Sequence, residues 1–196
     1  GWPMKKDSYL YTIIFTFVLT AVFATVLSVT QAYYLPTITE NEANVERQAI
    51  LKVLGITSEF DLVTTFEGQV TPVTAGTSST FAVYDEDGSP ISYAFPLDGQ
   101  GLWGSIRGYI GVSATFDRLL GMEFVEQNET PGLGGRIDEP WFKEQFAGVP
   151  LIPGENLVYG SGIDAITGAT SSSNAVLNIL NNTISELMPL KEVLAR

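Results

Sequence analysis

The feature that most constrains this chain is a long stretch near its beginning that carries no charge. No Asp, Glu, Lys or Arg occurs from Ser8 to Thr39, and Tyr9 to Val29 is apolar over the length that a helix needs to cross a bilayer. Inside lipid, a single segment satisfies its backbone hydrogen bonds only as a helix. We therefore expect one membrane-spanning helix here. The alternative is a cleaved signal peptide, for which the apolar stretch is long.

The charges on either side of this stretch predict its orientation. Lys5 and Lys6 precede it, whereas the first charged residues after it, beginning with Glu40, are acidic. Because basic residues concentrate on the cytoplasmic side of a span, we expect the N-terminus in the cytoplasm and the rest outside the inner (cytoplasmic) membrane, periplasmic or extracellular. Residues 1–35 would then be the cytoplasmic N-terminus and transmembrane helix, and residues 36–196 an extracytoplasmic domain.

Composition excludes several classes of site. The 196 residues include neither cysteine nor histidine, which rules out thiolate iron–sulfur clusters, c-type haem, Cys/His zinc sites and Ser-His or Cys-His catalysis. We expect no metal site and no catalytic residue of these kinds. The net charge is −12 and the 10 Lys and Arg residues are scattered, so we expect no nucleic-acid partner.

Hydrophobic periodicity and turn residues predict an α+β domain after the span. Helical spacing of apolar residues and strand-like runs both occur in this part of the chain. The expected elements are an amphipathic helix over 40–54, strands over 81–84, 91–95, 106–112 and 119–125, a short helix over 141–146 with Trp141 in the core, and a last helix over 171–188. Short connections, such as the turn at 85–90, favour a twisted, mainly antiparallel sheet flanked by helices.

Two short motifs carry the functional hypothesis. Asp164 to Thr170 read D-x-x-[ST]-G-A-T directly before the last helix, and Glu129 to Gly134 read E-T-P-G-L-G. A phosphate esterified to Thr170 would lie at a helix N-terminus, where unpaired N–H groups and the helix dipole favour an anion. The alternative is that Gly168 and the neighbouring hydroxyl residues form only a turn and a helix cap.

Together with Gly101 to Gly104, which read G-L-W-G, and with the order of the segments, these motifs resemble a known family. It is the family of covalent-FMN subunits. Its members are the C subunit of the sodium-translocating NADH:quinone oxidoreductase (Nqr) and the G subunit of the Rnf complex, which couples ferredoxin oxidation to NAD reduction. The local sequence around Trp103 and Glu129 is more similar to the Nqr protein, whereas the length is closer to the Rnf protein. The resemblance therefore leaves the host complex open.

The resemblance implies a role for each residue of the first motif. Thr170 would carry FMN as a phosphoester made by a flavin transferase. Gly168 and Ala169 would let the backbone approach the phosphate and the transferase, because a larger side chain would obstruct both. Asp164 and Thr167 would be recognised by the transferase, and the alternative for Asp164 is a turn residue. Ser171 and Ser172 would bond the phosphate oxygens or cap the helix.

The second motif and Trp103 would contact the isoalloxazine ring, again by resemblance. Glu129, Thr130, Leu133 and Gly134 belong to a rigid turn that would line the ring, and Trp103 would pack beside it. A phosphoester leaves the ring electronics nearly unchanged, so this pocket would tune the flavin potential. The alternatives are a purely structural turn and an ordinary core or interface tryptophan.

These expectations give one leading function and two alternatives. The leading hypothesis is a membrane-anchored electron-transfer subunit carrying covalent FMN in an ion-translocating NADH:quinone (Nqr-type) or ferredoxin:NAD (Rnf-type) oxidoreductase. Its partners would be the multispan membrane subunits of that complex, which pumps sodium or protons. The alternatives are a stand-alone outer-face flavoprotein for extracellular electron transfer, and a non-catalytic anchored interaction module in which the Thr170 motif is coincidental.

Overall fold

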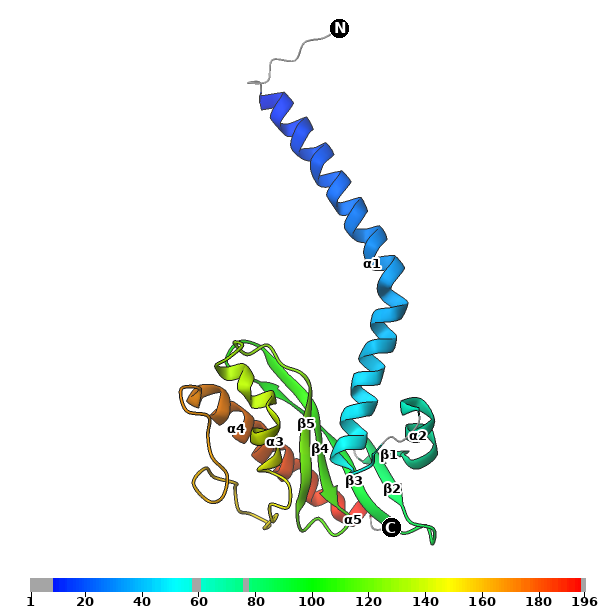
Figure 1. Ribbon diagram of the computed structural model, residues 1–196, viewed down its shortest axis with the longest axis vertical. Coiled ribbons are helices and arrows are strands. Elements are labelled where there is room, and N and C mark those ends of the chain that lie inside the picture. Colours follow the sequence, from blue (N-terminus) through cyan, green and yellow to red (C-terminus); the bar gives the residue numbers. More distant parts are fainter. Residues whose placement is uncertain (1–8, 58–60, 76–77, 195–196) are drawn as a thin grey trace. The chain divides into compact units, whose positions relative to one another are not determined.

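The computed structural model describes residues 9–57, 61–75 and 78–194. Lys5 and Lys6, on which the expected orientation depends, lie outside these ranges. Contacts between residues divide the chain after Ala43 into two compact units, and each is described by itself. The long helix α1 (Tyr9–Val53) begins in the first unit and ends in the second (Figure 1).

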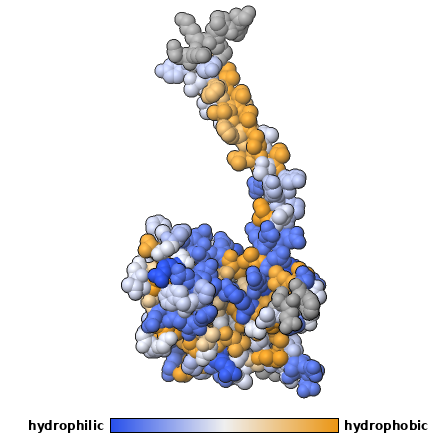
Figure 2. Space-filling view, in the orientation of Figure 1, coloured by the Kyte–Doolittle hydropathy of each residue, from blue (hydrophilic) through white to orange (hydrophobic). Residues whose placement is uncertain are grey.

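In the first unit, α1 carries the apolar stretch. The helix is long and apolar enough to cross a membrane, and large side chains such as Phe17 and Phe23 are exposed along it. Figure 2 shows hydrophobic residues gathered along this part of the helix. The two expected helices, 9–29 and 40–54, are parts of this one helix, which continues through Pro36. Proline lacks an N–H and costs a helix one hydrogen bond, but the turns on both sides keep theirs.

The second unit is built on a 5-stranded antiparallel sheet with the strand order β1-β2-β3-β4-β5. Each strand therefore pairs with its neighbour in sequence. The strands are β1 (Thr71–Ala75), β2 (Ser78–Tyr84), β3 (Pro90–Gln100), β4 (Ser105–Ser113) and β5 (Leu119–Glu126). The expected antiparallel sheet flanked by helices is confirmed. The Asp85 carboxylate accepts the N–H groups of Asp87 and Ser89 in the turn between β2 and β3.

Helices cover both faces of this sheet (Figure 1). One face packs against α4 (Thr170–Leu187), α3 (Pro140–Glu144) and the 3-10 helix η1 (Gly134–Asp138), and the other against the last turns of α1 and α2 (Leu62–Gln69). Along β3, Tyr93 and Phe95 belong to the core under α4, whereas Ala94 belongs to the core under α1. This alternation follows from the two-residue period of a strand. Each large apolar side chain buried here contributes about 1.5–3 kcal/mol.

The sequence patterns do not predict α2, β1, the 3-10 helix η2 (Met188–Leu190) or the short C-terminal helix α5 (Lys191–Leu194). For α2 a signal exists, because Asp61 is its N-cap and accepts the Thr64 N–H at 3.0 Å. The expectation that Trp141 lies in the core is wrong. Its ring is exposed, its indole N–H donates to Glu139, and the Arg136 guanidinium lies 5.6 Å from the ring centroid.

Candidate functional site

Three segments of the second unit meet at one buried carboxylate. Glu129 is only 4% exposed, and it follows β5 at the start of the E-T-P-G-L-G turn. Its Oε1 accepts the N–H groups of Leu102 (2.8 Å) and Trp103 (3.1 Å) in the loop between β3 and β4. Its Oε2 accepts the hydroxyl of Ser172 in the first turn of α4. We call this arrangement, made by Leu102, Trp103, Glu129 and Ser172, the Glu129 junction.

Two glycines leave the space that the Glu129 junction occupies. A Cβ on Gly101 would lie 2.5 Å from Glu129 Oε1, and a Cβ on Gly134 would lie 2.7 Å from Oε2. Real side chains do not tolerate such distances to heavy atoms. Gly101 and Gly134 are therefore required for close approach to the Glu129 carboxylate, beyond any effect on backbone flexibility.

The outer side of the Glu129 junction is apolar and exposed. Trp103 is 70% exposed, and Leu102 and Leu133 are each 54% exposed. Thr130 is also exposed, and its carbonyl accepts the N–H groups of Leu133 (3.1 Å) and Gly135 (2.9 Å), which closes the turn. Trp103 is thus not a core residue. The carboxylate faces inward while the neighbouring apolar side chains face solvent.

The D-x-x-[ST]-G-A-T segment has a regular pattern of exposure. Thr170 is the first residue of α4 and is exposed, whereas Ala169, directly before it, is buried. Ala169 is the N-cap, and within the described residues no side chain caps α4 there. Gly168 has a φ of +83°, a conformation that residues with a Cβ rarely adopt. The glycine of the motif therefore shapes the turn that brings Thr170 to the surface.

Hydrogen bonds with α4 hold the loop that precedes the Thr170 motif. Asn181 of α4 accepts the Leu157 N–H (2.8 Å) and donates to the Leu157 carbonyl (3.0 Å). The Tyr159 hydroxyl donates to the Ser173 carbonyl at 2.6 Å, and burial raises the pKa of Tyr159 to about 12, so this donor stays protonated. The loop before the motif is therefore fastened along α4.

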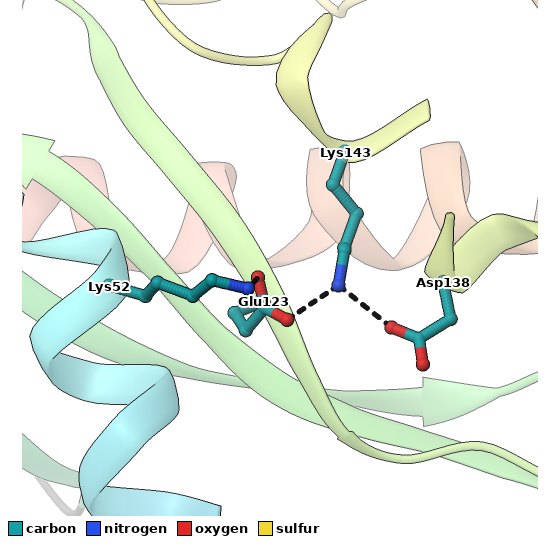
Figure 3. Close-up of polar contacts among 4 residues, drawn as sticks. All are labelled: Lys52, Glu123, Asp138 and Lys143. Atoms are coloured by element: carbon teal, nitrogen blue, oxygen red, sulfur yellow. Dashed lines mark hydrogen bonds and ion pairs between the residues drawn. The ribbon is translucent and has the colours of Figure 1, made fainter. Parts of the chain in front are cut away.

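An ion-pair network around the buried Lys143 side chain supports the other end of the E-T-P-G-L-G turn (Figure 3). Lys143 Nζ donates to Asp138 Oδ1 at 2.8 Å and to Glu123, which also pairs with Lys52 at 3.2 Å. The Lys143 side chain is 9% exposed. Burial works to lower the pKa of Lys143, but the bonds and charges of Asp138 and Glu123 outweigh it and the net shift is upward. Asp138 ends η1, which directly follows the turn, so the network fixes the turn to β5 and α3.

The structure brings some of the expected site residues together and holds others separately. Hydrogen bonds at the Glu129 junction link Trp103, Glu129 and the first turn of α4, while Gly134 packs against the same carboxylate. Asp164 is held instead by Gln145, whose side chain bonds both of its backbone groups. Thr167 and Ser171 are exposed near the two ends of the turn at Gly168.

Sequence reasoning missed the residues that support the site. Gln145, Tyr159 and Asn181 give no local signal, because each acts on a segment distant in sequence. Ser173 does give one, since it occupies the buried face of α4 together with Val176 and other apolar residues. A polar residue on an apolar helix face needs a hydrogen-bond partner.

Comparisons with known proteins agree with this geometry. A family model described as FMN-binding domain matches residues 101–185, from the G-L-W-G segment to α4. The G subunit of the ion-translocating oxidoreductase complex of Methanosarcina acetivorans is 30% identical over 172 residues, which cover 85% of this chain and 88% of that protein. The chain belongs to the family formed by RnfG and NqrC proteins. The fold agrees with that membership.

Other members match over different lengths. The NqrC protein of the Na⁺-translocating NADH-quinone reductase of Pasteurella multocida is 34% identical over 117 residues, but the chain spans only 45% of that relative. The crystal structure of the corresponding protein from Parabacteroides distasonis is similar with a TM-score of 0.63 and 26% identity, over 79% of this chain and 95% of that one. NqrC of Shewanella oneidensis gives a TM-score of 0.62 at 17% identity, over 80% and 98%, which supports the fold.

Proposed function

We propose that this family member is a membrane-anchored electron-transfer subunit that carries FMN as a phosphoester on Thr170. The observation that carries the proposal is the position of Thr170. Its exposed side chain begins α4, two residues before Ser172, which ties that helix to the Glu129 junction. An attachment point and an exposed apolar surface thus belong to one rigid arrangement.

The residues present fit an FMN group. The first N–H groups of α4, which has no side-chain cap at Ala169 among the described residues, are available to a phosphate. The exposed side chains of Leu102, Trp103 and Leu133 offer apolar contact to a ring, and Thr130 offers a hydroxyl. When bound, the flavin supplies reversible electron transfer. The protein's part is to position the ring, exclude water from one side and set the local charge.

Attachment itself is a substitution at phosphorus made by a flavin transferase. The Thr170 oxygen would form a bond to the FMN phosphorus of a flavin adenine dinucleotide donor, while the pyrophosphate bond of the donor would break and AMP would leave. The hydroxyl proton passes to a base of the transferase or to water. No oxidation or reduction is involved.

The setting that we propose is an ion-translocating oxidoreductase complex. The apolar part of α1 would anchor the chain, residues 36–196 would lie outside the cytoplasmic membrane, and multispan subunits would be the partners. The chain aligns with 88% of the length of the Methanosarcina G subunit but with only 45% of the length of the Pasteurella NqrC protein. This difference favours a complex of the Rnf type. A stand-alone flavoprotein of the outer face would use the same chemistry without those partners.

Mass spectrometry of the intact chain tests the proposal. We expect the chain, produced together with a flavin transferase, to gain the mass of one phosphoester-linked FMN. Thr170→Ala should abolish this gain, and Thr170→Ser, which keeps a hydroxyl, should retain it. A wild-type chain without added mass would refute the attachment. Purification of the loaded chain without multispan subunits from its native membrane would favour the stand-alone flavoprotein.

A further inference from the structure

The acceptor segment presents one side to solvent and buries the other. Asp164, Thr167 and Thr170 are exposed, whereas Ile166 and Ala169 are buried in the core. The exposed residues are the defined polar positions of the motif, and Ile166 is one of its variable positions. The surface that a transferase would read is therefore already formed in the folded chain.

Gln145 fixes the start of this surface. It follows directly after α3, and its Oε1 accepts the Asp164 N–H at 2.7 Å while its Nε2 donates toward the Asp164 carbonyl at 3.4 Å. The side-chain amide thus bonds both backbone groups of one residue, as a neighbouring β-strand would. Because the backbone is held in this way, the Asp164 carboxylate remains directed to solvent.

Ser173 fixes the other end. Its hydroxyl accepts the Ile166 N–H and donates to the Ala169 carbonyl, both at 3.0 Å. The turn at Gly168 lies between these two bonds. The segment is therefore held at Asp164 by Gln145 and at Ile166 and Ala169 by Ser173, although neither Gln145 nor Ser173 belongs to the motif.

We propose that Gln145 is a positioning residue for flavin attachment, which holds Asp164 so that the transferase meets a preformed acceptor surface. This inference rests on the proposed attachment of FMN to Thr170. Ordering a loop during association costs free energy, and a loop that is already ordered avoids that cost. Gln145 bonds Asp164 and the Phe142 carbonyl and lies outside the reacting group. Its loss should therefore weaken binding of the chain to the transferase and leave the chemical step unchanged.

Steady-state flavin attachment tests this inference. The full-length chain in detergent is the varied substrate, with purified transferase, Mg²⁺ and flavin adenine dinucleotide in excess. For Gln145→Ala we expect the KM for the chain to rise about tenfold with kcat unchanged, from the loss of two hydrogen bonds. Gln145→Glu keeps an acceptor for the Asp164 N–H and should raise KM less. Glu144→Ala, which removes a neighbouring exposed side chain of α3, is the matched control and should behave as wild type.

The outcomes separate the inference from the proposed function. A wild-type KM in Gln145→Ala, or a lower kcat at unchanged KM, overturns the positioning role. If Gln145→Ala does not fold, Gln145→Glu decides, and a wild-type KM in that variant overturns the role as well. Faster hydrogen exchange of the Asp164 amide in the variant with raised KM supports it. A wild-type chain that accepts no flavin refutes the attachment itself.

Discussion

Removing the Glu129 carboxylate should loosen the candidate site by an amount that can be worked out from its bonds. Glu129→Ala leaves the N–H groups of Leu102 and Trp103 and the Ser172 hydroxyl without their acceptor. A buried donor left unpaired costs about 1–3 kcal/mol. Water can reach the exposed loop at Leu102 and Trp103, so we take a cost near the lower end of this range for each of the three donors. The expected loss in unfolding free energy is about 2–4 kcal/mol.

Glu129→Gln should cost much less. Its side-chain oxygen can still accept both backbone N–H groups, and its amide nitrogen would face Ser172, whose hydroxyl can rotate to accept. We expect the unfolding free energy to fall by about 1 kcal/mol or less, because only the hydrogen bond with Ser172 changes direction. The comparison of the two variants therefore separates the acceptor geometry, which glutamine keeps, from the charge, which it removes.

Urea unfolding of the full-length chain in mild detergent, without flavin, measures both values through tryptophan fluorescence. Glu126→Gln is the matched control, because Glu126 is exposed and pairs with Arg107 at the surface, and such pairs contribute at most about 1 kcal/mol. Equal losses in Glu129→Ala and Glu129→Gln would refute the reasoning. So would a loss in Glu129→Ala no greater than that of the control.

Three further predictions follow from other parts of the molecule. In the loaded chain, Trp103→Leu should change the flavin midpoint potential in a redox titration while covalent flavin is retained; a wild-type potential would remove Trp103 from the ring site. Lys143→Met should destabilise the chain by about 2 kcal/mol at neutral pH, since it leaves Asp138 unpaired and Glu123 with Lys52 alone. The pKa of Lys143 is raised above its ordinary value of 10.5. The stability that the charged Lys143 adds is therefore fully present below pH 10.5 and is lost as the pH rises through the raised pKa. The difference in unfolding free energy between wild type and Lys143→Met should accordingly shrink at strongly alkaline pH. Protease added to intact spheroplasts should cut the second unit; protection of that unit would reverse the expected topology.

The sequence predicts those parts of the fold that depend on local patterns. The apolar stretch, the strands β2 to β5 and the helix α4 all have a clear period, and the ends of α4 agree within one residue with the expected range 171–188. The strand β1 and the helix α2 are short and lack such a pattern. The expectation divides the single helix α1 into a span over 9–29 and an amphipathic helix over 40–54, whereas the helix continues through Pro36.

The candidate site could be predicted only in its outline. The two motifs identify Thr170 and the turn from Glu129 to Gly134 as sequence features, but nothing in either motif states that the Glu129 carboxylate faces inward. That orientation depends on Ser172 and on the backbone of the loop at Trp103, which tertiary packing brings to it. Long-range side-chain to backbone bonds of this kind have no period and no fixed spacing, so a single sequence does not reveal them.

The Glu129 junction also explains how a flavin tethered through a flexible linkage could keep a defined position. A phosphoester and the ribityl chain contain several rotatable bonds, so attachment to Thr170 restricts where the ring can go without fixing its orientation. The orientation must then come from surfaces that do not move relative to the attachment point. Ser172 lies in the same helical turn as Thr170, and its bond to Glu129 ties that turn to the Trp103 loop. On the proposed attachment to Thr170, this one buried carboxylate would therefore hold the attachment point and the ring-contacting loop at a fixed separation.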